Sequence, residues 1–125
     1  MSLKFKLETI DPGEFLLKAL DGSTIKGTYS FSVEDSGRDD LKLVRGHVYV
    51  PQRFRGQSIG PRLIFRFGAE ICNLAEKDEA DYIHVVGFET PESRRVLSPI
   101  FSSFGYIEFE TRKGKPNLVR QYLPS

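Results

Sequence analysis

The chain has 125 residues, 39% hydrophobic and 28% charged, with a formal net charge of +1. We therefore expect a single domain over residues 1–125, since the chain is long enough for one core and too short for two. No apolar run reaches the ~18 residues of a membrane helix, and no signal peptide is predicted. The single cysteine, Cys72, fits a reducing, cytoplasmic setting, and its apolar neighbours on a predicted helix indicate a buried thiol.

The first fifty residues predict four antiparallel strands. Residues 3–9 alternate between apolar and charged side chains, which is typical of a half-buried strand. Residues 14–20 and 23–34 follow across short turns, and residues 35–40 are expected to be a polar loop. In the third strand we expect these side chains to face inward: Ile25, Tyr29, Phe31 and Val33. Residues 41–50 are apolar on both faces near their end, so this strand is predicted to be central.

The second half predicts helix, strand, helix and a terminal hairpin. A helix over residues 59–77 is indicated by apolar side chains at helical spacing, namely Ile59, Leu63, Phe67, Ile71 and Leu74. Residues 82–88 form the next predicted strand, and Thr90 with Pro91 marks the start of a helix that we expect to kink or break at Pro99. Residues 106–111 and 117–123 complete the pattern. The strand–helix–strand unit in the middle should be parallel and right-handed.

Charge is unevenly distributed along this order. Residues 41–69 contain six basic side chains and no acidic one. Within them, Arg55 to Gly60 ("RGQSIG") lies where a predicted strand gives way to a helix. Free amides and the dipole of a helix N-terminus favour anions, glycine permits close approach, and arginine adds charged donors. Taken alone, the segment is compatible with a phosphate-binding loop or with an ordinary basic turn.

Two motifs resemble those of the GNAT superfamily of acyl-CoA-dependent N-acyltransferases. "RGQSIG" resembles its pyrophosphate loop, and "FSSFGYIEF", Phe101 to Phe109, resembles its helix that ends in Gly-Phe or Gly-Tyr before a strand. The resemblance covers about residues 23–123. It implies an α+β fold of the α/β three-layer kind, with a mixed, mostly antiparallel sheet, a central parallel strand–helix–strand unit and a splayed strand pair.

The resemblance also implies a co-substrate and its contacts. Acetyl-CoA would lie where the strand ending at Val50 splays from residues 82–88, and its pantetheine would pair with backbone near Tyr49 and Val50. The residues that would bind the carrier through the loop are Arg55, Gly56, Gln57, Ser58, Ile59 and Gly60. An unidentified amine would attack the thioester directly.

The chain departs from the family pattern at four places. Ser58 replaces a usual glycine, and Pro61 removes an amide just beyond the loop. Two helices that usually follow the first strand have no room here, so the acceptor side would be open or completed by a second subunit. Phe101 stands where the family often has a tyrosine that protonates the departing thiolate, and Tyr106 is expected to pack in the core.

Two residues are candidate general bases. His47 lies on the fourth strand and is either a base or a partly buried histidine with a backbone partner. Glu89, just past the strand 82–88, is either a base at the cleft or part of a surface loop. We interpret His84 as structural, and no residue set has the spacing of a metal site.

Three functions are compatible with the sequence. The first is an N-acetyltransferase that uses acetyl-CoA. The second is a GNAT-fold protein that binds CoA or a partner but has lost efficient chemistry. The third, disfavoured by the low net charge, is a nucleic-acid binder that uses Arg45, Arg53, Arg55, Arg62 and Arg66.

Overall fold

The computed structural model describes residues 2–88, 90–110 and 116–123. One seven-stranded sheet has the order β1-β2-β3-β4-β5-β7-β6, and every neighbouring pair is antiparallel except β4 and β5. The strands are β1 (Lys4–Asp11), β2 (Glu14–Asp21), β3 (Thr24–Arg38), β4 (Leu41–Tyr49), β5 (Asp81–Val86), β6 (Ile107–Glu110) and β7 (Pro116–Tyr122). Helices α1 (Ile59–Asp78) and α2 (Pro91–Ser103) flank β5 in sequence, and a short 3-10 turn, η1 (Gln52–Phe54), precedes α1. The mixed sheet with its parallel unit is as predicted.

The third strand differs from the prediction at both ends. Ile25 is 43% exposed instead of inward-facing. The register passes from Ala19 opposite Gly27 to Leu20 opposite Ile25, so Lys26 is an extra residue that reverses the alternation. At the other end β3 continues to Arg38, through the expected polar loop, because the Ser36 hydroxyl donates to the Leu41 carbonyl at 2.6 Å and holds the strand ends together.

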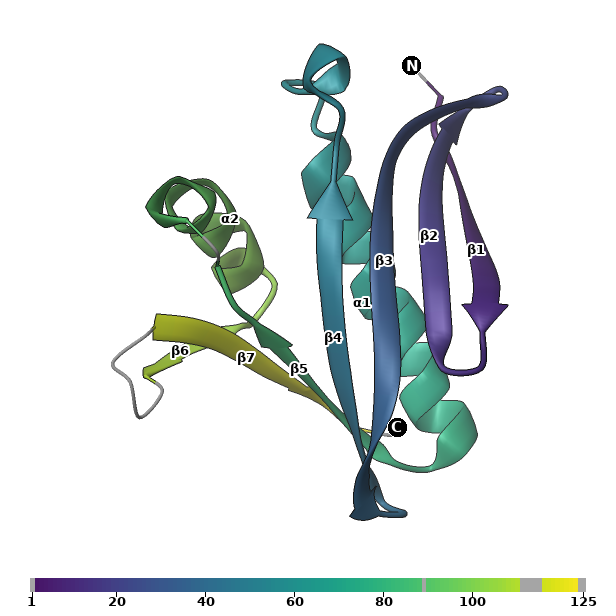
Figure 1. Ribbon diagram of the computed structural model, residues 1–125, viewed down its shortest axis with the longest axis vertical. Helices are drawn as coiled ribbons and strands as arrows, with labels where there is room; N and C mark the ends of the chain where they lie inside the picture. Colours follow the sequence, from purple (N-terminus) through teal and green to yellow (C-terminus); the bar gives the residue numbers. More distant parts are fainter. Residues whose placement is uncertain (1, 89, 111–115, 124–125) are drawn as a thin grey trace.

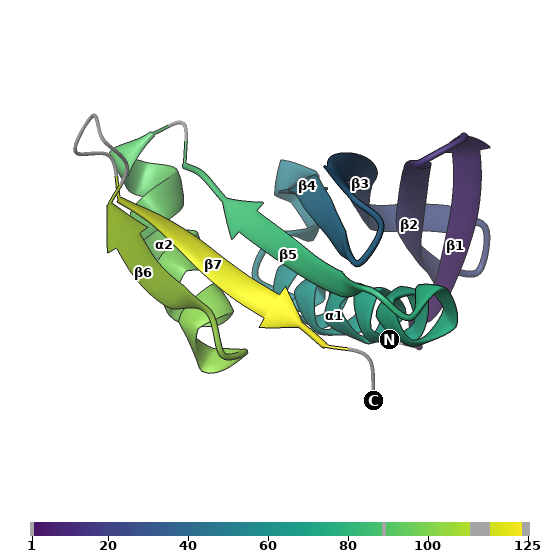
Figure 2. The ribbon, with the colours of Figure 1, turned by 90° about the horizontal axis from the view of Figure 1, so that it is seen from below.

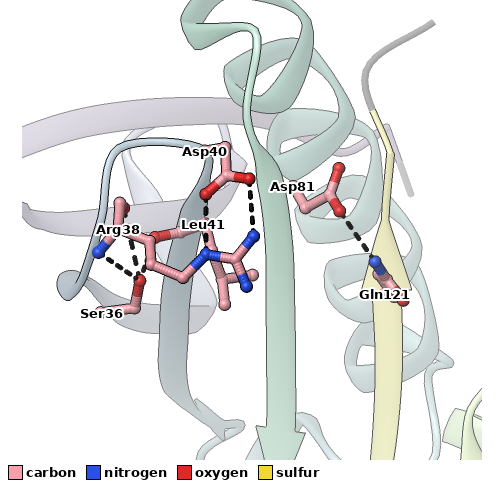
Figure 3. A network of polar contacts seen from close by, with 6 residues as sticks. All are labelled: Ser36, Arg38, Asp40, Leu41, Asp81 and Gln121. Atoms are coloured by element: carbon pink, nitrogen blue, oxygen red, sulfur yellow. Dashed lines mark hydrogen bonds and ion pairs between the residues drawn. The ribbon is translucent and has the colours of Figure 1, made fainter.

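Strands β4 and β5 are joined at one end and separated at the other. Their parallel pairing runs from Leu41 opposite Asp81 to Val44 opposite His84 and then stops. At the joined end the Asp81 amide donates to the Asp40 carbonyl at 2.9 Å, and Gln121 donates to the Asp81 carboxylate at 2.9 Å. Figure 3 shows this end, with the bidentate contact of Arg38 to Asp40 beside it. Beyond Val44 the two strands diverge in a V, which Figure 1 shows from the front.

Both helices pack on the same face of the sheet. Rings from both of them, Phe67 of α1 and Phe101 of α2, lie 4.7 and 6.2 Å from the ring of His84 on β5. Phe65 of α1 also lies near Phe104, the residue just after α2, with ring centroids 5.8 Å apart. Figure 2 shows α1 beneath β3 and β4. Among the described residues no helix covers the opposite face, because tight turns join β1, β2 and β3 and leave no chain for the third layer that the resemblance implied.

Two expectations about the helices need correction. Cys72 is exposed, one position away from the buried stripe that includes Ile71 and Ala75. The second helix runs without a break through Pro99, so the expectation of a break and restart there is wrong. Its start is as predicted, since the Thr90 hydroxyl accepts from the Ser93 amide at 3.0 Å.

His84 is the buried polar residue of the core, with 0% exposure. Its Nε2 lies 3.2 Å from the Tyr29 hydroxyl and its Nδ1 lies 2.5 Å from the Tyr106 hydroxyl, which in turn contacts the Tyr122 hydroxyl at 2.9 Å. A neutral imidazole has one donor and one acceptor nitrogen, and each faces a hydroxyl that can take the complementary role. Burial lowers the pKa of His84 from 6.5 to about 3, so the ring is neutral. The structural interpretation of His84 and the core position of Tyr106 both agree with this geometry.

This burial predicts a pH dependence of stability. Because the folded pKa of about 3 lies below the unfolded value of 6.5, the unfolded chain binds the extra proton, and stability present above pH 6.5 is lost as the pH falls toward 3. The slope approaches about 1.4 kcal/mol per pH unit. His84→Phe should remove this slope between pH 6.5 and 5 and cost about 1–3 kcal/mol at pH 7.5, since it deprives the Tyr29 hydroxyl of its partner. Urea unfolding of both proteins across pH 5–7.5 measures the free energy of unfolding at each pH. The same pH dependence in the wild-type protein and in His84→Phe would contradict the prediction.

Candidate functional site

The segment between β4 and α1 has an unusual backbone. Gly56 and Ser58 both have positive φ, of 83° and 62°, and Ser58 is the residue immediately before α1. The left-handed conformation costs a non-glycine residue roughly 1–2 kcal/mol. The Ser58 side chain makes no capping hydrogen bond. The local conformation is therefore one that glycine adopts more readily, and serine accepts it here.

The amides of this bend have no acceptor within the described part of the protein. Within the described residues, no loop hydrogen bond engages the amides of residues 56–60, and the first bond of the helix runs from Arg62 to the Ser58 carbonyl at 3.4 Å. Residues 55–58 are exposed, while Ile59 is buried. A helix start with unpaired amides carries a partial positive charge and is suited to an anion.

Close packing fixes where this helix starts. A Cβ on Gly27 of β3 would lie 3.0 Å from side-chain atoms of both Ile59 and Leu63, so glycine there allows the first turn of α1 to lie directly on the sheet. Gly60 differs, because a Cβ there would meet nothing closer than Val50 Cγ2 at 3.9 Å. The space beside Gly60 is therefore open.

Positive charge surrounds the bend. Arg55 donates from Nε to the Val50 carbonyl at 3.1 Å, which ties the loop to the end of β4. Lys26 lies 3.9 Å from the centre of the Phe54 ring, with Arg53 on the same ring at 4.6 Å. No acidic side chain occupies the first turn of α1. The predicted loop residues Arg55 to Gly60 thus form one segment at the end of β4, exposed from Arg55 to Ser58 and anchored by the buried Ile59.

The end of β4 also lies beside the divergence of the sheet. The pairing with β5 stops at Val44. From Arg45 to Tyr49, β4 remains paired with β3, but its other edge, which faces β5, has no partner strand among the described residues. Tyr49 is 53% exposed and Val50 is half-buried. The predicted contact residues Tyr49 and Val50 therefore join this open edge to the loop.

The structure describes one of the two candidate general bases, His47. His47 is exposed and points to the face of the sheet without helices, where the Ser30 hydroxyl donates to its carbonyl at 3.5 Å. Glu89 lies outside the described residues. Phe101 is 2% exposed and packs against Tyr106, with ring centroids 5.0 Å apart. His47 is therefore the titratable candidate that the structure places beside the unpaired edge of β4.

An open groove on the face without helices is a feature that the sequence did not reveal. It has a volume of about 580 Å³ and follows the serine side chains of β3 between β2 and β4. Its lining includes Ile10, Glu14, Leu16, Ser30, Ser32, Arg45 and His47. These residues come from four strands, so only the register of the sheet brings them together.

The arginines of the nucleic-acid hypothesis do not form one surface. Arg45 pairs with Glu34 at 3.6 Å on the face without helices. Arg62 and Arg66 lie over the Phe5 ring from α1, and Arg66 also pairs with Glu70 at 3.4 Å. The described residues also contain no group of three or more metal-ligating side chains, and neither described helix is long and apolar enough to cross a bilayer.

Comparison with solved structures identifies the architecture. A mutant of the toxin AtaT, bound to the C-terminus of the antitoxin AtaR, superposes with a TM-score of 0.70 at 10% identity over 97% of this chain and 92% of that chain. The chain has the GNAT fold. The ribosomal-protein-S18-alanine N-acetyltransferase of Escherichia coli matches with a TM-score of 0.59 at 12% identity over 92% of this chain and 72% of its own. A GNAT acetyltransferase of Staphylococcus aureus matches with the same score at 15% identity, over 87% and 68%.

These GNAT matches rest on structure. No family model matches the sequence, and no curated protein matches it. At such identities the likeness establishes the fold, as the two motifs and the order of elements predicted. Another structure of the AtaT mutant contains acetyl-CoA together with the antitoxin segment, with a TM-score of 0.65 at 12% identity over 86% of this chain and 68% of that chain.

The backbone at Ser58 gives a testable prediction for the segment between β4 and α1. Ser58→Gly should leave stability unchanged or raise it by up to about 1 kcal/mol, because relief of the left-handed conformation outweighs or offsets the added flexibility of the unfolded chain. Urea denaturation measures the change. As a control, Ser93→Gly within α2 should destabilise the protein, since glycine disfavours a helix with ordinary backbone angles. A loss of more than 1 kcal/mol for Ser58→Gly would contradict the assigned conformation.

Proposed function

We propose that this protein is an N-acetyltransferase that transfers the acetyl group of acetyl-CoA to a primary amine by direct attack. The observation that carries the proposal is the bend of unpaired amides, residues 56–60, which follows Arg55 and lies next to the edge of β4 that β5 leaves unpaired. The GNAT fold and the acetyltransferases that share it add support. The single exposed Cys72, with no second cysteine in the chain, fits a cytoplasmic setting.

Each part of the loop has a role in binding the carrier. The pyrophosphate would accept hydrogen bonds from the amides of Gln57, Ser58, Ile59 and Gly60, and Gly56 supplies the positive φ that turns the chain toward them. Arg55 is held by the Val50 carbonyl through Nε, which leaves its other guanidinium nitrogens for phosphate oxygens. The free backbone edge near Tyr49 and Val50 would pair with the pantetheine amides.

The chemistry needs a base for the amine and a proton for the thiolate. The amine nitrogen forms a bond to the thioester carbon, the carbon–sulfur bond breaks, and the proton of the amine moves to His47 or, in the second assignment, Glu89. A neutral imidazole has a nitrogen lone pair that can accept this proton. A free thiol has a pKa near 8.5, so the thiolate can depart without an acid, although a positioned acid contributes typically ~10²–10⁴-fold.

A second function is favoured by one observation. Phe101 occupies the position of the usual acid and is buried against His84 and Tyr106, so it donates no proton. A GNAT-fold protein that binds acetyl-CoA or a partner without efficient turnover has the same loop and the same phenylalanine. Binding and turnover experiments separate the two functions.

The carrier assignment predicts that Gly60→Glu weakens acetyl-CoA binding at least tenfold. The new carboxylate would stand beside the phosphates, while its Cβ would have room because the nearest atom is 3.9 Å away. Isothermal titration calorimetry measures the dissociation constant, and Arg55→Ala should weaken it as well. Ala69→Glu places the same charge on the exposed side of α1 and should have no effect. Absence of binding to the wild-type protein, or equal affinity for the Gly60 variant, would refute the proposal.

The missing acid predicts that Phe101→Tyr raises turnover by at least tenfold, because a hydroxyl would then stand at the position of the acid that the family often uses to protonate the departing thiolate. The measurement is thiol release from acetyl-CoA across a panel of primary amines. Phe65→Tyr adds a hydroxyl on the exposed side of α1 and serves as the control. If Phe101→Tyr binds acetyl-CoA normally and turns over no faster, this position is remote from the leaving sulfur.

A further inference from the structure

The groove on the face without helices consists of two rows of side chains across three strands. In one row Leu16, Ser30 and His47 are register partners, and in the next row Glu14, Ser32 and Arg45 are. The serines of β3 are small and form the floor, while the longer side chains of β2 and β4 form the walls. His47 stands at the β4 wall, beside the edge that has no partner beyond Val44.

The groove and the basic loop lie on opposite sides of β4. The loop leads into α1, which packs on one face through Ile59 and Leu63, whereas His47 and Arg45 project from the other face. A carrier bound at the loop therefore leaves the groove free, and the pairing of β4 with β5 ends before His47. An amine held in the groove would meet the thioester at His47.

We propose that the acceptor is an extended polypeptide with a basic side chain near its reacting amine, bound in this groove with the amine at His47 and the basic side chain at Glu14. This inference rests on the proposed function, because it assigns the acceptor of the same reaction. It specifies the substrate class and the residue that selects it.

The openness of the groove favours a polypeptide over a small molecule. Sites for small ligands are concave and bury most of the ligand's surface. Here the face has no helical cover among the described residues, and Glu14, Ser30, Arg45 and His47 are all exposed. A small amine would remain largely solvated, whereas an extended chain gains contacts along the whole length of the groove.

The charges of the groove favour a basic partner. Arg45 is paired with Glu34 at 3.6 Å, and Lys18, next to the groove, is paired with Glu8 at 3.0 Å. Glu14 lines the groove and has no ion pair within the described part of the chain. Its carboxylate is thus the charge that a bound cation would complement.

The register sets the spacing between the two ends of the acceptor. Strands β2 and β4 are separated by two strand spacings, about 9.6 Å, and the two rows are offset by about 6.6 Å. The diagonal is roughly 12 Å, which corresponds to about three residues of extended chain. The basic side chain is therefore expected about three residues from the reacting amine.

Two matched synthetic peptides test this assignment. Both carry a free N-terminal amine, and they differ only at the fourth residue, which is arginine in one and glutamate in the other. Thiol release gives kcat/KM for each, and calorimetry follows acetyl-CoA binding separately. The wild-type protein should prefer the arginine peptide at least tenfold, Glu14→Lys should reverse the preference, and Glu76→Lys on the exposed side of α1 should leave it unchanged.

Several results would overturn the assignment while leaving the proposed function intact. They are equal rates for the two peptides, an unchanged preference in Glu14→Lys, or faster acetylation of a small amine such as propylamine. A dimer in sedimentation velocity that dissociates on Glu14→Lys would assign the groove to a second copy of the chain instead. If acetyl-CoA does not bind at all, the proposed function fails, and fluorescence anisotropy of the two peptides then decides: charge-dependent binding supports the polypeptide groove, and no binding overturns it.

Discussion

The neutral, fully hydrogen-bonded His84 is the constraint on which the arrangement of the sheet depends. It occupies the last paired position between β4 and β5, and its partners come from β3 and from the segment between α2 and β6. Rings from both helices pack against it. Because a charged imidazole or an unpaired hydroxyl would be costly in this environment, the network fixes the point at which the two strands part. Beyond Val44, which pairs with His84, the edge of β4 that faces β5 is therefore unpaired.

Strand β4 contributes to both the loop and the groove, which lie on opposite sides of the sheet. Its end carries the basic loop that starts α1, and its outward side chains form one wall of the groove. A reaction between a bound carrier and a bound amine needs two separate approaches to one point, and the alternating side chains of a strand supply them. The absence of helical cover over β2–β4 among the described residues leaves the outward side chains of β4 open to solvent.

Local periodicity was sufficient to predict most elements. The alternation in residues 3–9 and 23–34 and the helical stripe from Ile59 to Leu74 correspond to β1, β3 and α1, because each pattern reflects one buried face. The errors arose where a shift of one residue changed which side chains face the core. Lys26 is a bulge that exposes Ile25, and Cys72 lies one helical position beyond the buried Ile71. The end of β3 was missed because the Ser36 hydroxyl substitutes for backbone pairing.

The site was only partly predictable. The loop could be found because its residues are consecutive and its glycines and arginines have distinctive chemistry. The hydroxyl network around His84 and the groove of Glu14, Ser32 and Arg45 draw on residues separated by tens of positions, so strand register had to be known first. A signal for the groove did exist in the small polar residues at alternate positions of β3, which are uncommon on a sheet face that packs against a helix.

The two parts of the sheet differ in how far apart in sequence their contacts lie. Strands β1–β4 pair with one another across short turns. Strand β5 pairs with β4 across the whole of α1 and with β7 across α2 and β6. Since contacts between distant residues require costly loop closure, we expect the N-terminal meander to form early and the C-terminal strands to dock later. The short pairing between β4 and β5 would then be the last part of the sheet to form during folding and the first to separate under mild denaturation.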